Sequence, residues 1–110
     1  MGGSGTTSRL WLVELEHDVA RLRCSYQRHR KRIVQFTVQL EISHGNKWQA
    51  IVRYDNAHGF CHRDILHADG TQDKDPVYYG NVNETFTHAV DELREHWRAH
   101  LARFLREVQP

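Results

Sequence analysis

The sequence predicts a single α+β domain in which an antiparallel, meander-like sheet of about four strands packs against a long C-terminal helix. Apolar and polar residues alternate strictly over 34–42, which is typical of a strand with one buried face. Apolar residues recur every three or four positions from 86 to 108, which indicates an amphipathic helix. A chain of 110 residues is long enough for one hydrophobic core and too short for two.

Composition limits the class of protein. Hydrophobic residues make up 39% of the chain and charged residues 26%, and the net charge is +1, as expected for a soluble domain with a modest core. No apolar run approaches the roughly 20 residues that cross a bilayer, so no membrane partner is expected. Residues 1–8 lack a signal-peptide pattern and are expected to form a flexible tail before a domain at 9–110.

The cysteine content favours a reducing, cytoplasmic environment. Cys24 and Cys61 are too few for a disulfide scaffold and form no CxxC pair, although a single bridge between them stays open. Cys61 lies within a polar segment and is expected to be a small packing residue rather than a nucleophile.

Two apolar runs come first in the domain. Residues 9–16 fit a short helix or a strand, because the run is too short for its period to decide. Over 19–26, Leu22, Cys24 and Tyr26 alternate with polar neighbours, which favours a strand in the later half of this segment.

A hairpin is expected next. The strand at 34–42 ends in a turn at 44–46, and residues 47–54 resume the alternation with Ile51 as an exception. If the apolar side chains of this second strand face the core, Arg53 and Asp55 project together from the opposite face. A further strand at 60–66 should return beside it, with His62 and Asp64 on one of its two mixed faces.

The end of the chain is expected to be a loop, a short strand and the helix. Residues 72–76 read as an acidic loop, and 76–80 as a brief strand. Asn83 is the expected N-cap of a helix that runs to about Glu107. Its apolar stripe should pack on the sheet face that carries Phe36, Val38 and Leu40. His96 and His100, four residues apart on this helix, are interpreted as surface residues rather than metal ligands.

A basic segment lies between Arg21 and Arg32, with six lysines and arginines and no acidic residue. It fits either a solvated turn between two strands or a patch that contacts the phosphates of nucleic acid. In the second reading RNA is the partner. The candidate RNA-binding residues are four from this turn and two from later in the chain: Arg28, Arg30, Lys31, Arg32, Arg63 and Lys74.

Residues 53–67 gather histidines, arginines and aspartates into one short segment, and three interpretations compete. In the first, the segment cleaves RNA without a metal or other cofactor, because histidine titrates near neutral pH and can act as acid or base. Arginine would hold the phosphate and aspartate would orient an imidazole. The candidate catalytic residues are Arg53, Asp55, His58, His62 and His67.

The other two interpretations need no acid–base catalysis by histidine. In one, imidazoles and a carboxylate hold zinc or another divalent metal of a hydrolase, with the candidate ligands His58, His62, His67 and Asp64. In the other, the polar residues pair with one another and hold a turn in place. The protein would then be a non-enzymatic module that binds nucleic acid or protein.

Arg53-Tyr54-Asp55-Asn56-Ala57, followed by three histidines, resembles the signature of the TumE-type toxins of bacterial toxin–antitoxin systems. The string from Arg53 to Lys74 also resembles a related group of small bacterial proteins with no assigned function. The resemblance covers about residues 33 to 105 and implies a cytoplasmic ribonuclease-type toxin with a cognate antitoxin as partner. A homodimer is a further candidate assembly. The toxin pattern has a proline- and histidine-rich run after this string, where the chain has residues 58–64 instead.

Overall fold

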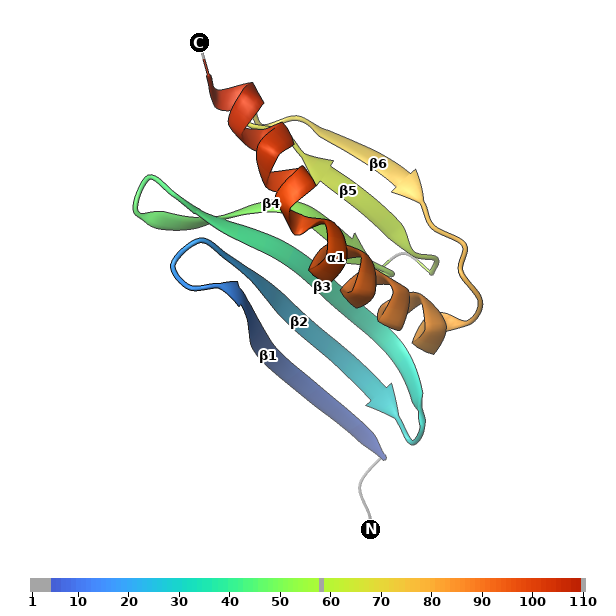
Figure 1. Ribbon diagram of the computed structural model, residues 1–110. Coiled ribbons are helices and arrows are strands. Elements are labelled where there is room, and N and C mark those ends of the chain that lie inside the picture. Colours follow the sequence, from blue (N-terminus) through green and yellow to red (C-terminus); the bar gives the residue numbers. More distant parts are fainter. Residues whose placement is uncertain (1–4, 58, 110) are drawn as a thin grey trace.

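Six antiparallel strands form one sheet in sequence order, and a single helix lies along one of its faces (Figure 1). The computed structural model describes residues 5–57 and 59–109. The elements are β1 (Thr6–Glu16), β2 (Ala20–His29), β3 (Arg32–His44), β4 (Lys47–Asp55), β5 (His62–Leu66), β6 (Gln72–Pro76) and α1 (Val82–Val108). This arrangement confirms the α+β class, the antiparallel sheet and the C-terminal helix.

The expectation of about four strands was wrong, because residues 9–16 of β1 were left open between a helix and a strand and residues 72–76 of β6 were assigned to a loop. β1 carries apolar side chains on both faces, with Leu10 and Leu12 exposed, so its sequence does not show the alternation of apolar and polar residues that identifies a strand. β6 is fully exposed and charged, and the segment gives no hydrophobic signal; its strand is defined by pairing with β5. The brief strand expected at 76–80 is a loop beyond Pro76.

The start of the domain also differs from the expected tail. Thr6, Thr7 and Ser8 belong to β1, where they lie opposite His29, Arg28 and Gln27 of β2. Residues 1–4 of the expected tail lie outside the described residues. In residues 5–57 and 59–109, no helix combines the length and apolar character that a membrane span requires.

The core lies between α1 and the central strands. Leu22, Val38, Leu40 and Val52 are fully buried on the sheet, and Leu93 is their fully buried counterpart on α1. Trp97 and Phe104 of the predicted stripe are also buried, whereas Phe86, Val90 and Leu101 pack at its margin. The expected packing of the helix stripe on the sheet is therefore confirmed.

The helix begins two residues earlier than expected, with Asn81 rather than Asn83 as its N-cap. The Asn81 side chain accepts a hydrogen bond from the backbone N–H of Glu84 at 2.9 Å, and the Glu84 carboxylate accepts one from the Asn81 N–H. This capping box requires a spacing of three residues, which only Asn81 has to Glu84. Asn83 instead binds Ile33 N–H and the Lys31 carbonyl, which ties the helix start to β3.

Ile51 broke the predicted alternation because it is the extra residue of a β-bulge. Leu40 lies opposite Val52 and Glu41 opposite Ala50, so Ile51 has no partner on β3. The bulge turns the Ile51 side chain into the core, where it is fully buried. The strands beyond the bulge keep a strict alternation, which sorts their polar residues onto two opposite faces.

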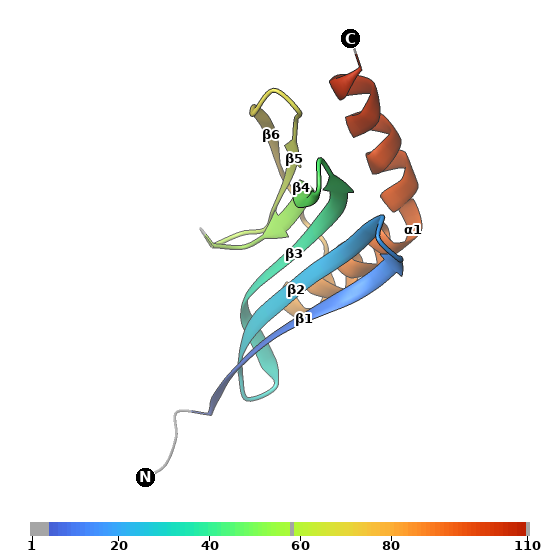
Figure 2. The ribbon, with the colours of Figure 1, turned by 90° about the vertical axis from the view of Figure 1, so that its left-hand side faces the viewer.

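The two faces of the sheet are covered differently. Figure 2 shows α1 on one side only; this side is called the helix face, and the other the open face. Tyr54 and Arg63 lie on the helix face, where Tyr54 bonds a glutamate of α1. Arg53, Asp55, His62 and Asp64 alternate with them and lie on the open face. The sequence predicted this face for Arg53 and Asp55, and predicted a shared but unassigned face for His62 and Asp64.

Candidate functional site

A polar cluster on the open face is made by three adjacent strands. Arg53 of β4 lies opposite Asp64 of β5, which lies opposite Lys74 of β6. One row away, Asp55 lies opposite His62. These five residues are called the open-face cluster. The structure thus brings together three of the predicted catalytic residues with Asp64 and Lys74.

Arg53 is held at the edge of the cluster by a chain of hydrogen bonds. Its Nε donates to Gln39 Oε1 at 2.8 Å, and Gln39 Nε2 donates to Glu41 Oε2 at 2.6 Å. Arg21 and Arg23 donate to the same carboxylate at 2.7 and 3.1 Å. Burial raises the pKa of Glu41, but these hydrogen bonds and the nearby charges outweigh it and leave the pKa below its usual range.

Two members of the cluster are buried although no helix covers them. Asp64 is 3% exposed, with Lys74 Nζ at 3.4 Å from Oδ1; within residues 5–57 and 59–109 this oxygen accepts no hydrogen bond. His62 is 8% exposed, and its ring centroid lies 4.5 Å from that of Phe60; among the described residues, its buried Nδ1 has no hydrogen-bond partner. A buried polar atom left unpaired costs about 1–3 kcal/mol, so these two positions call for an explanation.

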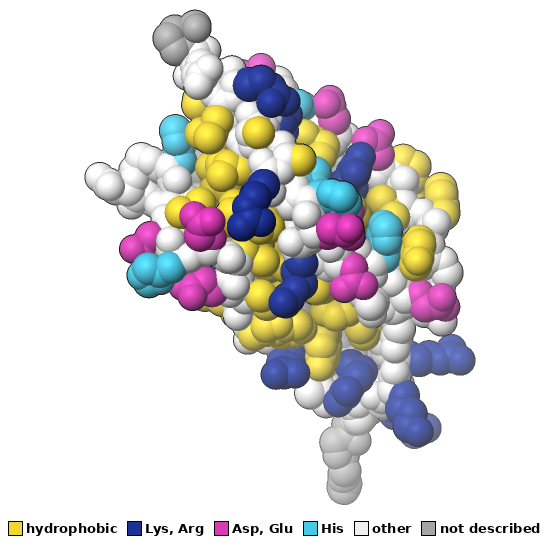
Figure 3. Space-filling model, viewed as in Figure 1, with side chains coloured by type: hydrophobic (Ala, Val, Ile, Leu, Met, Phe, Trp, Pro, Cys, Tyr) yellow, Lys and Arg dark blue, Asp and Glu magenta, His cyan; other side chains and the backbone are white. Residues whose placement is uncertain are grey.

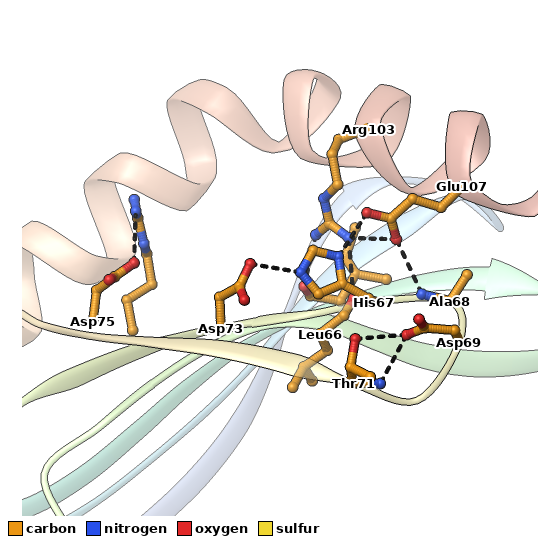
Figure 4. Close-up of polar contacts among 11 residues, drawn as sticks. Leu66, His67, Ala68, Asp69, Thr71, Asp73, Asp75, Arg103 and Glu107 are labelled. Atoms are coloured by element: carbon orange, nitrogen blue, oxygen red, sulfur yellow. Dashed lines mark hydrogen bonds and ion pairs between the residues drawn. The ribbon is translucent and has the colours of Figure 1, made fainter.

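Of the two remaining predicted catalytic residues, the structure describes only His67. His67 lies on the helix face, where Nδ1 is 2.7 Å from Glu107 and Nε2 is 2.8 Å from Asp73 (Figure 4). His62 and His67 therefore lie on opposite faces of the sheet and do not converge on one substrate. His58 lies outside the described residues.

The alternative metal ligands are divided in the same way, because His62 and Asp64 are on the open face and His67 is not. Among the described residues, no group of three histidine, cysteine or acidic side chains is arranged to hold a metal ion. On α1, His100 bonds Glu92 and His96 lies 3.9 Å from Glu95. Cys61 is buried, and its burial raises the pKa of the thiol to about 11, which agrees with a packing residue.

The basic turn is the β2–β3 hairpin, and its side chains are exposed at one end of the molecule. Figure 3 shows lysine and arginine side chains gathered at this lower end. Among the described residues, no carboxylate lies within 4.0 Å of Arg28, Arg30, Lys31 or Arg32. Arg63 and Lys74 of the same predicted set lie away from the hairpin, and each faces an aspartate.

A groove adjoins this basic hairpin. One hollow of about 760 Å³ is lined by Arg32 to Gln35 of β3, the β4–β5 loop and the first residues of α1. A second hollow of about 410 Å³ shares four of those lining residues, among them Asn56 and Asn81, so the two hollows adjoin each other. The β4–β5 loop is anchored by Asn56, whose amide bonds Phe36 N–H and the Val34 carbonyl.

Three exposed aromatic rings border the second hollow, and sequence reasoning did not select them. Phe60, Tyr78 and Tyr79 are 48%, 80% and 52% exposed, and the Phe60 and Tyr78 rings stack at 6.5 Å. The sequence indicates only weakly that these rings form a binding surface, because two tyrosines before a glycine also fit a strand. The strand predicted at 76–80 assigned the two tyrosines to the sheet instead of the groove, and the strand predicted at 60–66 did the same for Phe60.

A second polar chain on the helix face was also missed. The Tyr54 hydroxyl donates to Glu92 Oε1 at 2.6 Å, and His100 Nε2 lies 2.9 Å from Glu92 Oε2. Burial raises the pKa of Glu92, but the hydrogen bonds from His100 and Tyr54 outweigh it and lower the pKa overall. Tyr54 and Glu92 are separated by 38 positions, so no local pattern could have paired them.

Comparison with known proteins gives one finding. No curated protein and no solved structure matches the chain significantly. The resemblance to the TumE-type toxins therefore stays a prediction. The model of one family, described as a domain of unknown function and designated DUF7718, matches residues 4–110, so the chain belongs to that family.

Proposed function

We propose that this protein binds single-stranded RNA at the end of the sheet that carries the basic hairpin and the groove. The observation that carries the proposal is that the hairpin cations, which have no carboxylate within 4.0 Å among the described residues, and the exposed rings border two adjoining hollows. Arg32 belongs to the hairpin and also lines the first hollow, and the second hollow ends at Phe60, Tyr78 and Tyr79.

The cations of the hairpin supply the affinity for phosphate. Arginine and lysine side chains that have no acidic partner are free to displace the counterions of a nucleic acid backbone. The exposed rings supply stacking, which is worth about 1–3 kcal/mol per base in single-strand binding proteins. Because a base must be unstacked to lie on such a ring, the surface favours a single strand over a duplex.

The binding proposal is tested by titrating a fluorescent single-stranded RNA with the protein over a series of salt concentrations. Replacing Arg28, Arg30 and Lys31 by glutamine should flatten the dependence of log K on log salt by about 2, because each lost phosphate contact removes about 0.7. Tyr78→Ala should weaken binding with little change in that slope.

A matched control removes three arginines from the exposed surface of α1, by Arg94→Gln, Arg98→Gln and Arg106→Gln. This variant carries the same net charge as the hairpin variant and should bind RNA as the wild type does. Equal loss of affinity in the two variants would show that RNA binding depends on the net charge of the protein and not on the basic hairpin. Absence of binding at low salt would reject the proposal.

A second function, cleavage of the bound RNA, is favoured by two buried atoms of the open-face cluster, His62 Nδ1 and Asp64 Oδ1, which find no hydrogen-bond partner in the part of the chain that the structure describes. Polar groups left unsatisfied inside a protein are found at catalytic positions, where substrate completes their contacts. His62 would transfer a proton, Asp55 would orient its imidazole, and Arg53 would bind the phosphate. His62 contacts Phe60, whose ring borders the groove, so RNA on the rings would run beside the cluster.

Cleavage is tested with a labelled RNA in the presence of a chelator, at pH values from about 5 to 9, across the range where histidine titrates. His62→Gln should lower the rate by on the order of 10²–10⁴-fold with the fold intact, because acid–base catalysis contributes about this much. His67→Gln, on the opposite face, is the control and should retain the rate. Intact RNA at every pH, with and without added divalent metals, would reject cleavage and leave the binding proposal standing.

A further inference from the structure

The two edges of the sheet differ in how they prevent pairing with another strand. β6 is short, fully exposed, carries three charged residues and ends at Pro76. These features protect an edge strand, because charge and proline disfavour an added neighbour. β1 is 11 residues long and, in the described part of the chain, pairs with β2 alone. Its centre, Leu10 to Val13, has neither charge nor proline.

Two apolar side chains of β1 also lack a covering layer. Leu10 lies opposite Ser25 and Leu12 opposite Arg23, a register that puts both leucines on the open face. They are 63% and 48% exposed. Trp11, between them, points to the helix face and packs against the rings of Tyr26 and Phe86. The edge therefore combines an unpaired backbone with unburied leucines.

We propose that β1 pairs with β1 of a second copy of this chain, antiparallel and with the two-fold axis at Trp11. Residues opposite each other in an antiparallel pair point to the same face. This register puts Leu10 opposite the partner's Leu12 and Leu12 opposite the partner's Leu10, so the four leucines form one apolar patch. The two six-stranded sheets then continue into each other, with both helices on the same side.

The charges of β1 select a second copy in this orientation. Arg9 lies in the first half of the strand, and Glu14 and Glu16 lie in the second half. Antiparallel pairing with the axis at Trp11 puts Arg9 opposite the partner's Val13 and Glu14 opposite the partner's Ser8, so no like charges face each other. A parallel pair would bring like charges together. The strand is therefore complementary to itself, as an isologous two-fold interface requires.

The pairing does not depend on the RNA proposal. The axis at Trp11 lies five positions from Thr6, which is opposite His29 at the base of the basic hairpin. The two hairpins would thus lie at opposite ends of the joined sheet. RNA bridging between copies is a separate route to association, and it is removed by purifying the protein at high salt after nuclease treatment.

Sedimentation equilibrium over a range of protein concentrations tests the pairing. The wild type should follow a monomer–dimer equilibrium without larger species. Leu10→Lys with Leu12→Lys should be monomeric, because the substitution sets four positive charges against one another. Both side chains are exposed, so circular dichroism should show an unchanged fold. Leu105→Lys with Val108→Lys, on exposed positions of α1, is the control and should still dimerise.

Disulfide trapping tests the register. A chain with Leu10→Cys mixed with a chain with Leu12→Cys should form the mixed disulfide in preference to either identical pair. Cys24 and Cys61 are buried and free, so they contribute little background. A wild type that stays monomeric to its solubility limit overturns the proposal. So does a dimer that survives the double lysine substitution, or equal trapping of identical and mixed pairs.

Discussion

His67 shows how a single side chain joins three segments of the chain. Its two ring nitrogens each face a carboxylate, Glu107 at the end of α1 and Asp73 on β6 (Figure 4). Glu107 also accepts from Ala68 N–H and from Arg103, and Asp69 lies in the adjoining turn. Because both nitrogens meet acceptors, the geometry fits the doubly protonated imidazolium.

The hydrogen bonds to Asp73 and Glu107 raise the pKa of His67 above its ordinary value. A raised pKa in the folded state means that the charged imidazole stabilises the fold below about pH 6.5, the value in the unfolded chain. This contribution is lost as the pH rises through the folded-state pKa. His67→Gln should therefore lower the urea midpoint of unfolding at pH 6. At strongly alkaline pH the midpoints of the variant and the wild type should be the same.

Glu107 provides the matched test of the same contact. Burial raises the pKa of its carboxyl, but hydrogen bonds from His67 and Ala68 outweigh it and lower the pKa overall. Its contribution to stability is present above the unfolded-state pKa and lost as the pH falls through the folded-state pKa. Glu107→Gln should reproduce the loss seen in His67→Gln at pH 6. A deficit in His67→Gln that stays constant from pH 6 into the alkaline range would contradict the imidazolium contact.

At the scale of elements, the predictable parts are those whose pattern is local. The β3–β4 hairpin was predicted from alternation and its turn, and Gly45 and Asn46 indeed have positive φ angles. The amphipathic pattern of α1 fixed its buried stripe, but not which of two asparagines caps it. β6 could not be predicted, because its five residues have no buried face, and its pairing with β5 gives no hydrophobic signal.

The candidate site was predictable only where strand alternation applies. Arg53 and Asp55 were expected to share one face of a strand, and His62 and Asp64 one face of the next; the pairing of the two strands, which the sequence did not give, puts all four on the open face. Lys74 joins them across β6, a strand that the sequence did not reveal. His67 was grouped with His62 by proximity in sequence, but positions 62 and 67 differ by an odd number and so lie on opposite faces.

At the scale of the molecule, one helix covers only part of a six-stranded sheet. α1 packs on β3 and β4, and its margin reaches the ring cluster of Trp11, Tyr26 and Phe86. β5 and β6 are held mainly by backbone pairing and by polar contacts such as those of His67. The stability of the whole domain therefore depends on the few residues at the centre of the helix–sheet contact.

Leu93 is the sharpest probe of that dependence. It is fully buried, and Leu93→Ala removes packing from the layer between α1 and the sheet. The substitution should lower the free energy of unfolding by about 2–5 kcal/mol, the range for buried leucines that leave a cavity. Leu105→Ala, at a position 40% exposed on the same helix, makes the same chemical change and should cost well under half of this. Urea denaturation followed by tryptophan fluorescence measures both, and similar losses in the two variants would show that the helix–sheet layer does not carry the stability of the domain.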